Sequence, residues 1–112
     1  MALIKLDKAN WKTFFDRVSK ASIGKRAEIE VAALDLGAQV EAEWLPLLGI
    51  VYDPKDDIIE IALENLDHMI RKPREVFVGQ GGLGLTSLKA TDGDGRQHIV
   101  QLREPLMLPQ PA

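Results

Sequence analysis

Three carboxylates crowd one short turn of this sequence. Asp53, Asp56 and Asp57 lie within Asp53-Pro54-Lys55-Asp56-Asp57, between two apolar segments. Crowded carboxylates raise one another's pKa, so one could act as a general acid or base, and together they could bind a divalent cation. The other interpretation is a solvated turn beside the wet face of a sheet, with like charges that discourage edge-to-edge association. We favour the solvated turn. A small-molecule or metal-assisted enzyme that uses residues 53–57 with a histidine is the alternative.

The two histidines, His68 and His98, do not have the spacing of a metal site, because no HxH or HExxH pattern contains them. Ser87, His98 and Asp92 could be combined into a Ser-His-Asp triad on paper, but three residues chosen from a list do not define one. The absence of cysteine removes thiolate nucleophiles, disulfides and sulfur-ligated metals. The sequence therefore predicts no catalytic residue, no metal ligand and no cofactor.

Two glycine-rich segments resemble ligand-binding loops without their context. Gly79–Gly84 contains GxGGxG, but a Rossmann phosphate loop opens a helix, whereas Leu85–Lys89 has the pattern of a strand. Asp92–Gly95 resembles the start of a calcium loop. An EF-hand needs Gly at position 6 and Glu at position 12, and here these are Gln97 and Arg103. We predict that both segments only connect strands.

One basic corner and one apolar tail are the remaining candidate contact surfaces. Arg71, Lys72 and Arg74 surround Pro73 and form the predicted anion-binding corner. We favour the other interpretation, in which these cations stabilise the end of a short helix through its dipole. The closing segment is apolar and bounded by prolines. Within it, a predicted partner-binding surface comprises Leu106, Met107 and Leu108.

The net charge of −3 conceals an uneven distribution. Residues 1–27 carry seven basic and two acidic side chains, whereas residues 28–67 carry eleven acidic side chains and one lysine. A nucleic-acid-binding protein needs a concentrated basic face. The pattern instead indicates a basic helix and an acidic sheet that attract each other, and single-strand binding through Arg71–Arg74 is a third hypothesis.

Hydrophobic periodicity predicts an α+β domain. Trp11, Phe14, Phe15 and Val18 form one apolar stripe at helical spacing within residues 8–22, with Asp7 as the predicted N-cap. Alternation and apolar runs then predict strands, followed by a short second helix near 65–72. Segments with a strand pattern cover residues 27–34, 39–45, 47–52, 58–64, 74–78, 85–91 and 96–103. Alternation places Val40, Ala42 and Trp44 on one face, and Pro46 interrupts the pattern after them. The predicted floor beneath the helix comprises Trp44, Ile59, Ile61 and Leu63.

The predicted architecture is an N-terminal amphipathic helix packed on a bent antiparallel sheet of five to six strands. A small SH3-like or Sm-like barrel with an N-terminal helix is the alternative. Residues 1–112 are expected to form one domain, with residues 105–112 an extended or frayed tail. No window approaches the ~18 apolar residues of a membrane helix, so we expect a cytoplasmic protein with no membrane contact.

Long strings of this chain resemble a family of small bacterial single-domain proteins whose function is uncharacterised. These strings are WKTFFDRVSK, EWLPLLGIVYDPKDDIIEIALENLDHMIRKPREVFV and REPLMLP, so the resemblance extends from Trp11 to Pro109. It implies a stand-alone cytoplasmic domain and assigns no activity, catalytic residue or cofactor. On the residues themselves, we predict a non-enzymatic binding or assembly module. Its partner, an unknown protein or a second copy, would contact a sheet edge or the tail.

Overall fold

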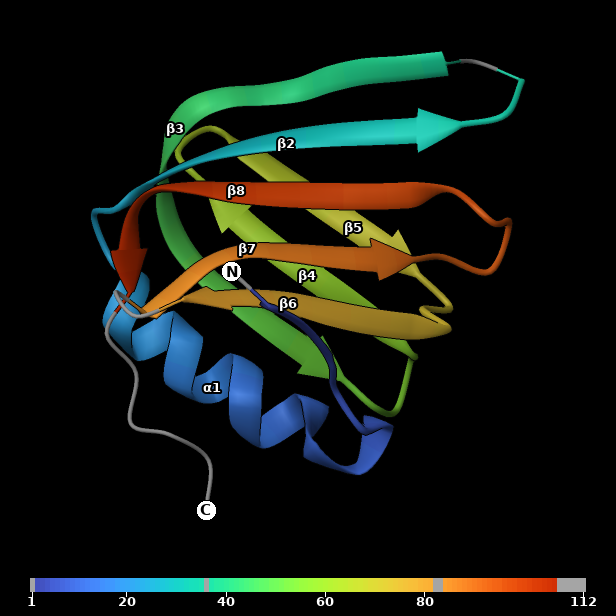
Figure 1. The fold of residues 1–112 in the computed structure, drawn as a ribbon, viewed down its shortest axis with the longest axis horizontal. Coiled ribbons are helices and arrows are strands. Elements are labelled where there is room, and N and C mark those ends of the chain that lie inside the picture. The colour runs from blue at the N-terminus through green and yellow to red at the C-terminus, as the bar shows by residue number, and fades with distance from the viewer. Residues whose placement is uncertain (1, 36, 82–83, 107–112) are drawn as a thin grey trace.

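The computed structural model describes residues 2–35, 37–81 and 84–106, which form one α-helix against eight antiparallel strands (Figure 1). The strand order is β1-β6-β7-β8-β2-β3-β4-β5. The α+β class is confirmed, but the sheet has more strands than predicted. The elements are β1 (Ala2–Lys5), η1 (Lys8–Asn10), α1 (Trp11–Ser22), β2 (Arg26–Ala33), β3 (Gly37–Asp53), β4 (Ile58–Leu63), β5 (Leu66–Arg71), β6 (Glu75–Gly81), β7 (Gly84–Thr91) and β8 (Gln97–Leu106).

The predicted second helix near 65–72 is wrong, because these residues form strand β5. Asn65 adopts a left-handed backbone (φ 64°) in the tight turn that joins β4 to β5. Burial along β5 then alternates, with His68 and Ile70 turned inward and Asp67 and Met69 outward. Two helical turns and a six-residue strand are hard to distinguish from so short an apolar pattern.

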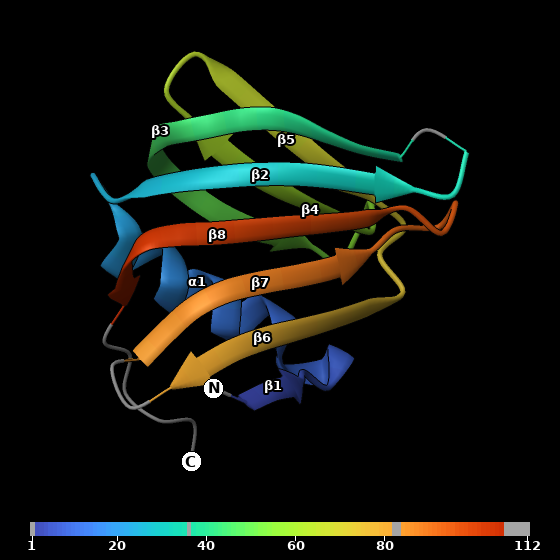
Figure 2. The ribbon, with the colours of Figure 1, turned by 45° about the horizontal axis from the view of Figure 1, so that its top comes forward.

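Strand β3 bends the sheet into two layers. Its first half, residues 37–46, pairs with β2, and its second half, residues 47–53, pairs with β4. Two strands were predicted here, and Pro46 was expected to separate them. Instead Pro46 lies inside one continuous strand, at the point where pairing changes, and its carbonyl accepts a hydrogen bond from the Glu64 N–H. β4 and β5 therefore pass behind β8 and β2 (Figures 1 and 2).

The sheet does not close into the alternative barrel. Its end strands are β1 and β5, and each has only one partner among the described strands. The free half of β3, residues 37–45, is likewise paired on one side only, with β2. Helix α1 runs along the open side of the two layers (Figures 1 and 2) and packs mainly on β3.

The predicted aromatic stripe of α1 is confirmed as core. Trp11, Phe15 and Val18 are at most 2% exposed and Phe14 is 8% exposed. The Trp11 indole N–H donates to the Leu6 carbonyl at 3.2 Å. The Asp7 side chain makes no capping bond, because a 3-10 turn precedes the helix and the Asp7 carbonyl accepts the Asn10 N–H instead. Of the predicted floor residues, Ile59, Ile61 and Leu63 of β4 are buried, whereas Trp44 is not.

Two irregularities in the pairing of β2 with β3 reverse a prediction about which residues face the core. Alternation placed Val40, Ala42 and Trp44 on the buried face, but only Ala42 is buried there, at 4% exposure. The register shifts on both sides of Ile29, where β-bulges insert extra residues into β3. Each inserted residue exchanges the two faces for the residues beyond it. Val40 is therefore 55% exposed and Trp44 is half-buried.

Candidate functional site

Trp44 occupies a strained position on β3. Its φ of 49° lies in the left-handed region, which a bulky side chain adopts at a cost of about 1 kcal/mol or more. The bulge between the Ala27 and Ile29 pairings is the cause, because it inserts Trp44 between residues that face the core. The indole is consequently half-buried instead of packing with Ala42 in the core.

Two arginines from neighbouring strands hold Trp44. Arg26 of β2 donates from its guanidinium to the Trp44 carbonyl at 3.0 Å. The Arg103 guanidinium of β8 lies over the Trp44 ring, 5.9 Å from its centroid, in a cation–π contact. Because β2 separates β8 from β3, this contact crosses the outer surface of β2. Arg26 and Arg103 are both exposed and form no ion pair with any described residue.

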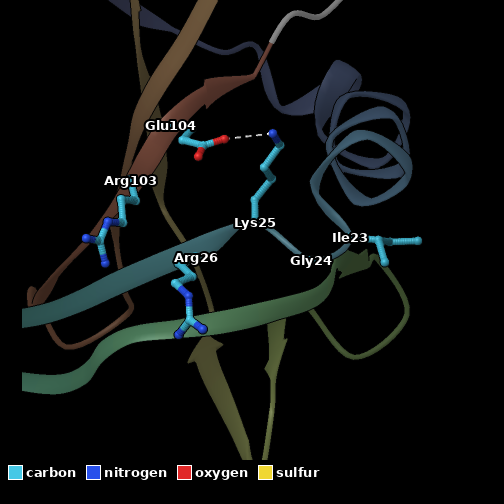
Figure 3. A pocket seen from close by; sticks show the side chains of 6 residues that line it. All are labelled: Ile23, Gly24, Lys25, Arg26, Arg103 and Glu104. Atoms are coloured by element: carbon cyan, nitrogen blue, oxygen red, sulfur yellow. Dashed lines mark hydrogen bonds and ion pairs between the residues drawn. The ribbon is translucent and has the colours of Figure 1, made fainter.

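A pocket of about 450 Å³ opens beside these arginines, where α1 gives way to β2 and where β8 approaches its end (Figure 3). Lys25 points toward Glu104, and its ammonium lies 2.9 Å from the Glu104 carboxylate. This hydrogen bond and charge lower the pKa of Glu104 below its ordinary value. The pocket therefore holds three cationic side chains and one carboxylate. Its lining residues are Ile23, Gly24, Lys25, Arg26, Arg103 and Glu104.

The acidic turn binds its own neighbours. The Asp53 carboxylate accepts the Lys55 N–H at 2.9 Å, which closes the turn. Asp57 accepts the Tyr52 hydroxyl at 2.7 Å and lies 3.6 Å from the Lys8 ammonium. Burial and the hydrogen bond to Asp57 raise the pKa of Tyr52 to about 12. The carboxylates therefore stabilise the turn and attach it to the residues before α1.

The two histidines meet each other and do not meet the acidic turn. His68 Nε2 lies 2.8 Å from His98 Nδ1, and His98 Nε2 lies 2.8 Å from the Asp92 carboxylate. His68 is opposite Ile61 in the β4–β5 register, whereas the acidic turn adjoins Ile58. No group of three His, Asp or Glu residues in ranges 2–35, 37–81 and 84–106 could hold a metal ion. The enzyme hypothesis that combined residues 53–57 with a histidine is not supported by this arrangement.

Of the three residues that could be combined into a Ser-His-Asp triad, only two meet. Asp92 and His98 are hydrogen-bonded, but Ser87 pairs with Gln101, three positions along β8 from His98. The Asp92–Gly95 segment forms the predicted hairpin turn, in which Asp92 accepts the backbone N–H groups of Asp94 and Arg96. The glycine-rich segment joins β6 to β7 through the Gly81–Gly84 pair, as predicted for a connection, and residues 82–83 lie outside the described part.

The predicted basic corner is exposed and fastened to two turns. The Lys72 N–H donates to the Asp57 carbonyl, and the Arg71 carbonyl accepts the Gly93 N–H. Arg74 donates from its guanidinium to the Gly93 carbonyl. Because no helix precedes Pro73, the helix-dipole explanation for these cations no longer applies. Anion binding by Arg71, Lys72 and Arg74 stays a prediction.

The predicted tail surface begins inside the protein. Leu106 is the last residue of β8, pairs with Leu85 and is 2% exposed, so it belongs to the core and cannot offer an exposed contact. Met107 and Leu108 lie outside the described residues, and their part of the prediction is untested. Sequence reasoning missed Trp44, Arg26 and Arg103. The one available signal was a tryptophan two residues before a proline in an otherwise regular strand.

The fold and the pocket define a small α+β protein with one basic, tryptophan-containing corner. The chain belongs to a family of unknown function (DUF5335), whose pattern it matches over residues 2–111. It is 36% identical over 111 residues to an uncharacterised protein of Aquifex aeolicus (strain VF5), an alignment that covers 98% of this chain and 100% of that protein. No solved structure matches it. No helix in the described residues is long and apolar enough to cross a membrane.

Proposed function

We propose that the protein is a non-enzymatic binding module and that it binds its partner at the Trp44 corner, which comprises Trp44, Lys25, Arg26 and Arg103. The observation that carries this proposal is the half-buried Trp44 ring, which a left-handed backbone presents beside two unpaired arginines. A strained backbone that removes a tryptophan from the core lowers stability, which is typical of a residue retained for contact with a partner.

The residue types support a protein partner. Tryptophan and arginine are the residues most enriched among those that dominate binding energy at protein interfaces. The guanidinium groups of Arg26 and Arg103 can each form paired hydrogen bonds with a carboxylate. Lys25 adds a third cation, although Glu104 partly neutralises it. We therefore propose an acidic protein segment as the partner, with an apolar or aromatic residue that packs on the Trp44 ring.

The surrounding charges disfavour a long polyanion. Residues 28–67 carry eleven acidic side chains, and Glu43 directly precedes Trp44 in the sequence. A nucleic acid places a charge at every nucleotide and would run from the corner onto this acidic surface. A short segment with no more than about four carboxylates would fit the corner without that repulsion. The acidic surroundings therefore favour an acidic peptide over a single-stranded nucleic acid as the partner.

The test is a backbone NMR titration of the full chain with a pentapeptide, acetyl-Glu-Glu-Phe-Glu-Glu-amide. We expect shifts at residues 23–26, 44 and 102–104, and we expect Arg103→Ala to weaken binding about tenfold, the equivalent of ~1.4 kcal/mol. Arg71→Ala is the matched control, because it removes an exposed arginine from the predicted basic corner and should leave the affinity unchanged.

Two further probes make the outcome decisive. The matched peptide with glutamine in place of glutamate should not bind, because it lacks the charge that the arginines recognise. An oligo-dT strand should bind more weakly than the acidic peptide. The proposal is wrong if millimolar acidic peptide shifts no signal at the Trp44 corner, or if its shifts gather at Arg71–Arg74.

A further inference from the structure

A chain of three polar side chains crosses the core between the two layers of the sheet. Asp92 follows β7, His98 lies on β8, and His68 lies on β5, the end strand of the other layer. Both contacts in this chain, Asp92–His98 and His98–His68, measure 2.8 Å. Asp92 and His98 are 8% and 5% exposed, and His68 is half-buried.

The hydrogen bonds in this chain have a defined direction. Asp92 is fixed by the N–H groups of Asp94 and Arg96, and an ionised carboxylate can only accept. Burial acts to raise the pKa of Asp92, but the hydrogen bonds from His98 and from the Arg96 and Asp94 backbone lower it below its ordinary value. His98 therefore donates from Nε2, accepts at Nδ1 the proton of His68 Nε2, and leaves a lone pair at His68 Nδ1.

The other residues around the His68 and His98 rings are apolar, or their side chains point away from the rings. His98 pairs with Val31 of β2 and Ala90 of β7, and His68 pairs with Ile61 of β4. Asp67 on β5 and Glu60 on β4 are the nearest carboxylates in sequence and register, and both stand at alternate positions that face outward. Among the described residues on these strands, the charged and titratable groups that face the two rings are Asp92 and the rings themselves.

Two polar contacts attach β5 to the opposite layer: the His68–His98 bond in the middle of the strand, and the Gly93 N–H that donates to the Arg71 carbonyl at its end. One edge of β5 pairs with β4, and its other edge has no partner among the described strands. Its inward side chains are Leu66, His68 and Ile70, of which His68 alone can form a hydrogen bond. An end strand with only one paired edge is expected to open at a lower free energy than the central strands of the sheet.

We propose that the Asp92–His98–His68 chain is a pH-sensitive fastener that holds β5 against β8 and releases it when both rings are protonated. One added proton leaves the fastener closed. The proton binds at His68 Nδ1 while the shared proton moves to His98 Nδ1, so both hydrogen bonds persist and the positive ring lies against Asp92. A second proton places N–H groups on both facing nitrogens and two cations side by side, and the His68–His98 bond is lost.

The expected pH range follows from His68. Burial, together with the neighbouring His98 ring, lowers the pKa of His68 from 6.5 to about 4. Because attachment lowers its pKa, His68 binds a proton more readily when β5 is detached from β8. The attachment of β5 is therefore complete above about pH 6.5 and weakens progressively as the pH falls to about 4.

The test is amide hydrogen exchange of the full chain between pH 7 and pH 4, after correction for the intrinsic pH dependence of exchange. We expect exchange within residues 66–71 to accelerate at least tenfold relative to residues 26–33 of β2. In His68→Asn, whose amide can still donate to His98 without titrating, the ratio between the two strands should stay constant. Asp67→Asn, which changes an outward carboxylate on the same strand, should behave as the native protein does.

The imidazole NMR signals provide a readout that does not depend on a variant folding. In the native protein at pH 7, the nitrogen signals should show His98 protonated at Nε2 and His68 protonated at Nε2. The proposal is overturned if β5 and β2 keep a constant exchange ratio in the native protein down to pH 4. It is also overturned if micromolar Zn²⁺ shifts both rings at pH 7, because the two nitrogens would then form a metal site rather than a fastener.

Discussion

The histidine chain and the Trp44 corner both join side chains from distant strands, yet they differ in how completely their groups are paired. Every polar atom along Asp92, His98 and the facing edge of His68 has a hydrogen-bond partner. At the Trp44 corner, Arg26 and Arg103 contact a carbonyl and a ring but no carboxylate. Complete pairing indicates a structural role, whereas exposed, unpaired arginines beside a tryptophan indicate a surface for a partner.

We expect the largest loss of stability from a substitution at Asp92. Asp92→Ala should lower the free energy of unfolding by about 3 kcal/mol, because His98 Nε2 and two backbone N–H groups lose their acceptor inside the protein. Urea unfolding followed by circular dichroism measures this change. Asp94→Ala, on an exposed residue of the same turn, should change stability by less than about 0.5 kcal/mol. Equal losses in the two variants would contradict a structural role for the histidine chain.

The next effect is the pH dependence of stability. Between pH 6.5 and pH 4 the native protein should lose about 1–2 kcal/mol through His68, less than its full pKa shift implies, because the ring is partly exposed to solvent. Stability falls as the pH falls, since the unfolded chain binds the proton first. Urea midpoints measured across this range should decline less steeply in His68→Asn. Parallel declines in the two proteins would assign the acid sensitivity to other groups.

Substitutions at Trp44 test whether the backbone at this residue is strained. Trp44→Gly should be more stable than Trp44→Ala by roughly 1 kcal/mol, because glycine adopts a φ of 49° without the penalty that alanine keeps. Urea unfolding compares the two variants directly, and both should lose affinity for the acidic pentapeptide. A Trp44→Gly variant less stable than Trp44→Ala would show that the backbone at this position carries no strain.

The smallest stability effect is expected at Arg103. Arg103→Ala should change the free energy of unfolding by less than about 0.5 kcal/mol, because the side chain is exposed and forms no ion pair with a described residue. Thermal unfolding of the variant and the native protein measures this difference. A loss above 2 kcal/mol would place Arg103 among the structural residues and remove the distinction between the two regions.

Local patterns were sufficient to predict much of the fold. The stripe formed by Trp11, Phe14, Phe15 and Val18 gave the helix and its buried face, and the alternation of Ile59, Ile61 and Leu63 gave the floor of the core. The errors arose where one residue changes the local geometry. Asn65 turns the chain tightly and makes β5 a strand, and the bulges near Ile29 exchange the faces of Val40 and Trp44. Neither the tight turn nor the bulges can be recognised from the hydrophobic periodicity of the sequence.

Both clusters depend on pairing between residues far apart in the sequence. His68 and His98 are thirty positions apart and meet because β3 folds β5 behind β8. Arg26 and Arg103 lie side by side because β2 pairs with β8, a contact between strands that no local turn specifies. Spacing alone could therefore identify neither site. The combination of Ser87, His98 and Asp92 was rejected as a triad, yet Asp92 and His98 are hydrogen-bonded, and the third partner is His68 rather than Ser87.

The most direct test of the central claim is a map of backbone amide shifts in the full chain when the acidic pentapeptide is added. The account predicts shifts at residues 23–26, 44 and 102–104, and it predicts no change at Asp92, His98 or His68. Shifts centred on the two histidines or on the acidic turn at residues 53–57, with the Trp44 corner unchanged, would contradict it.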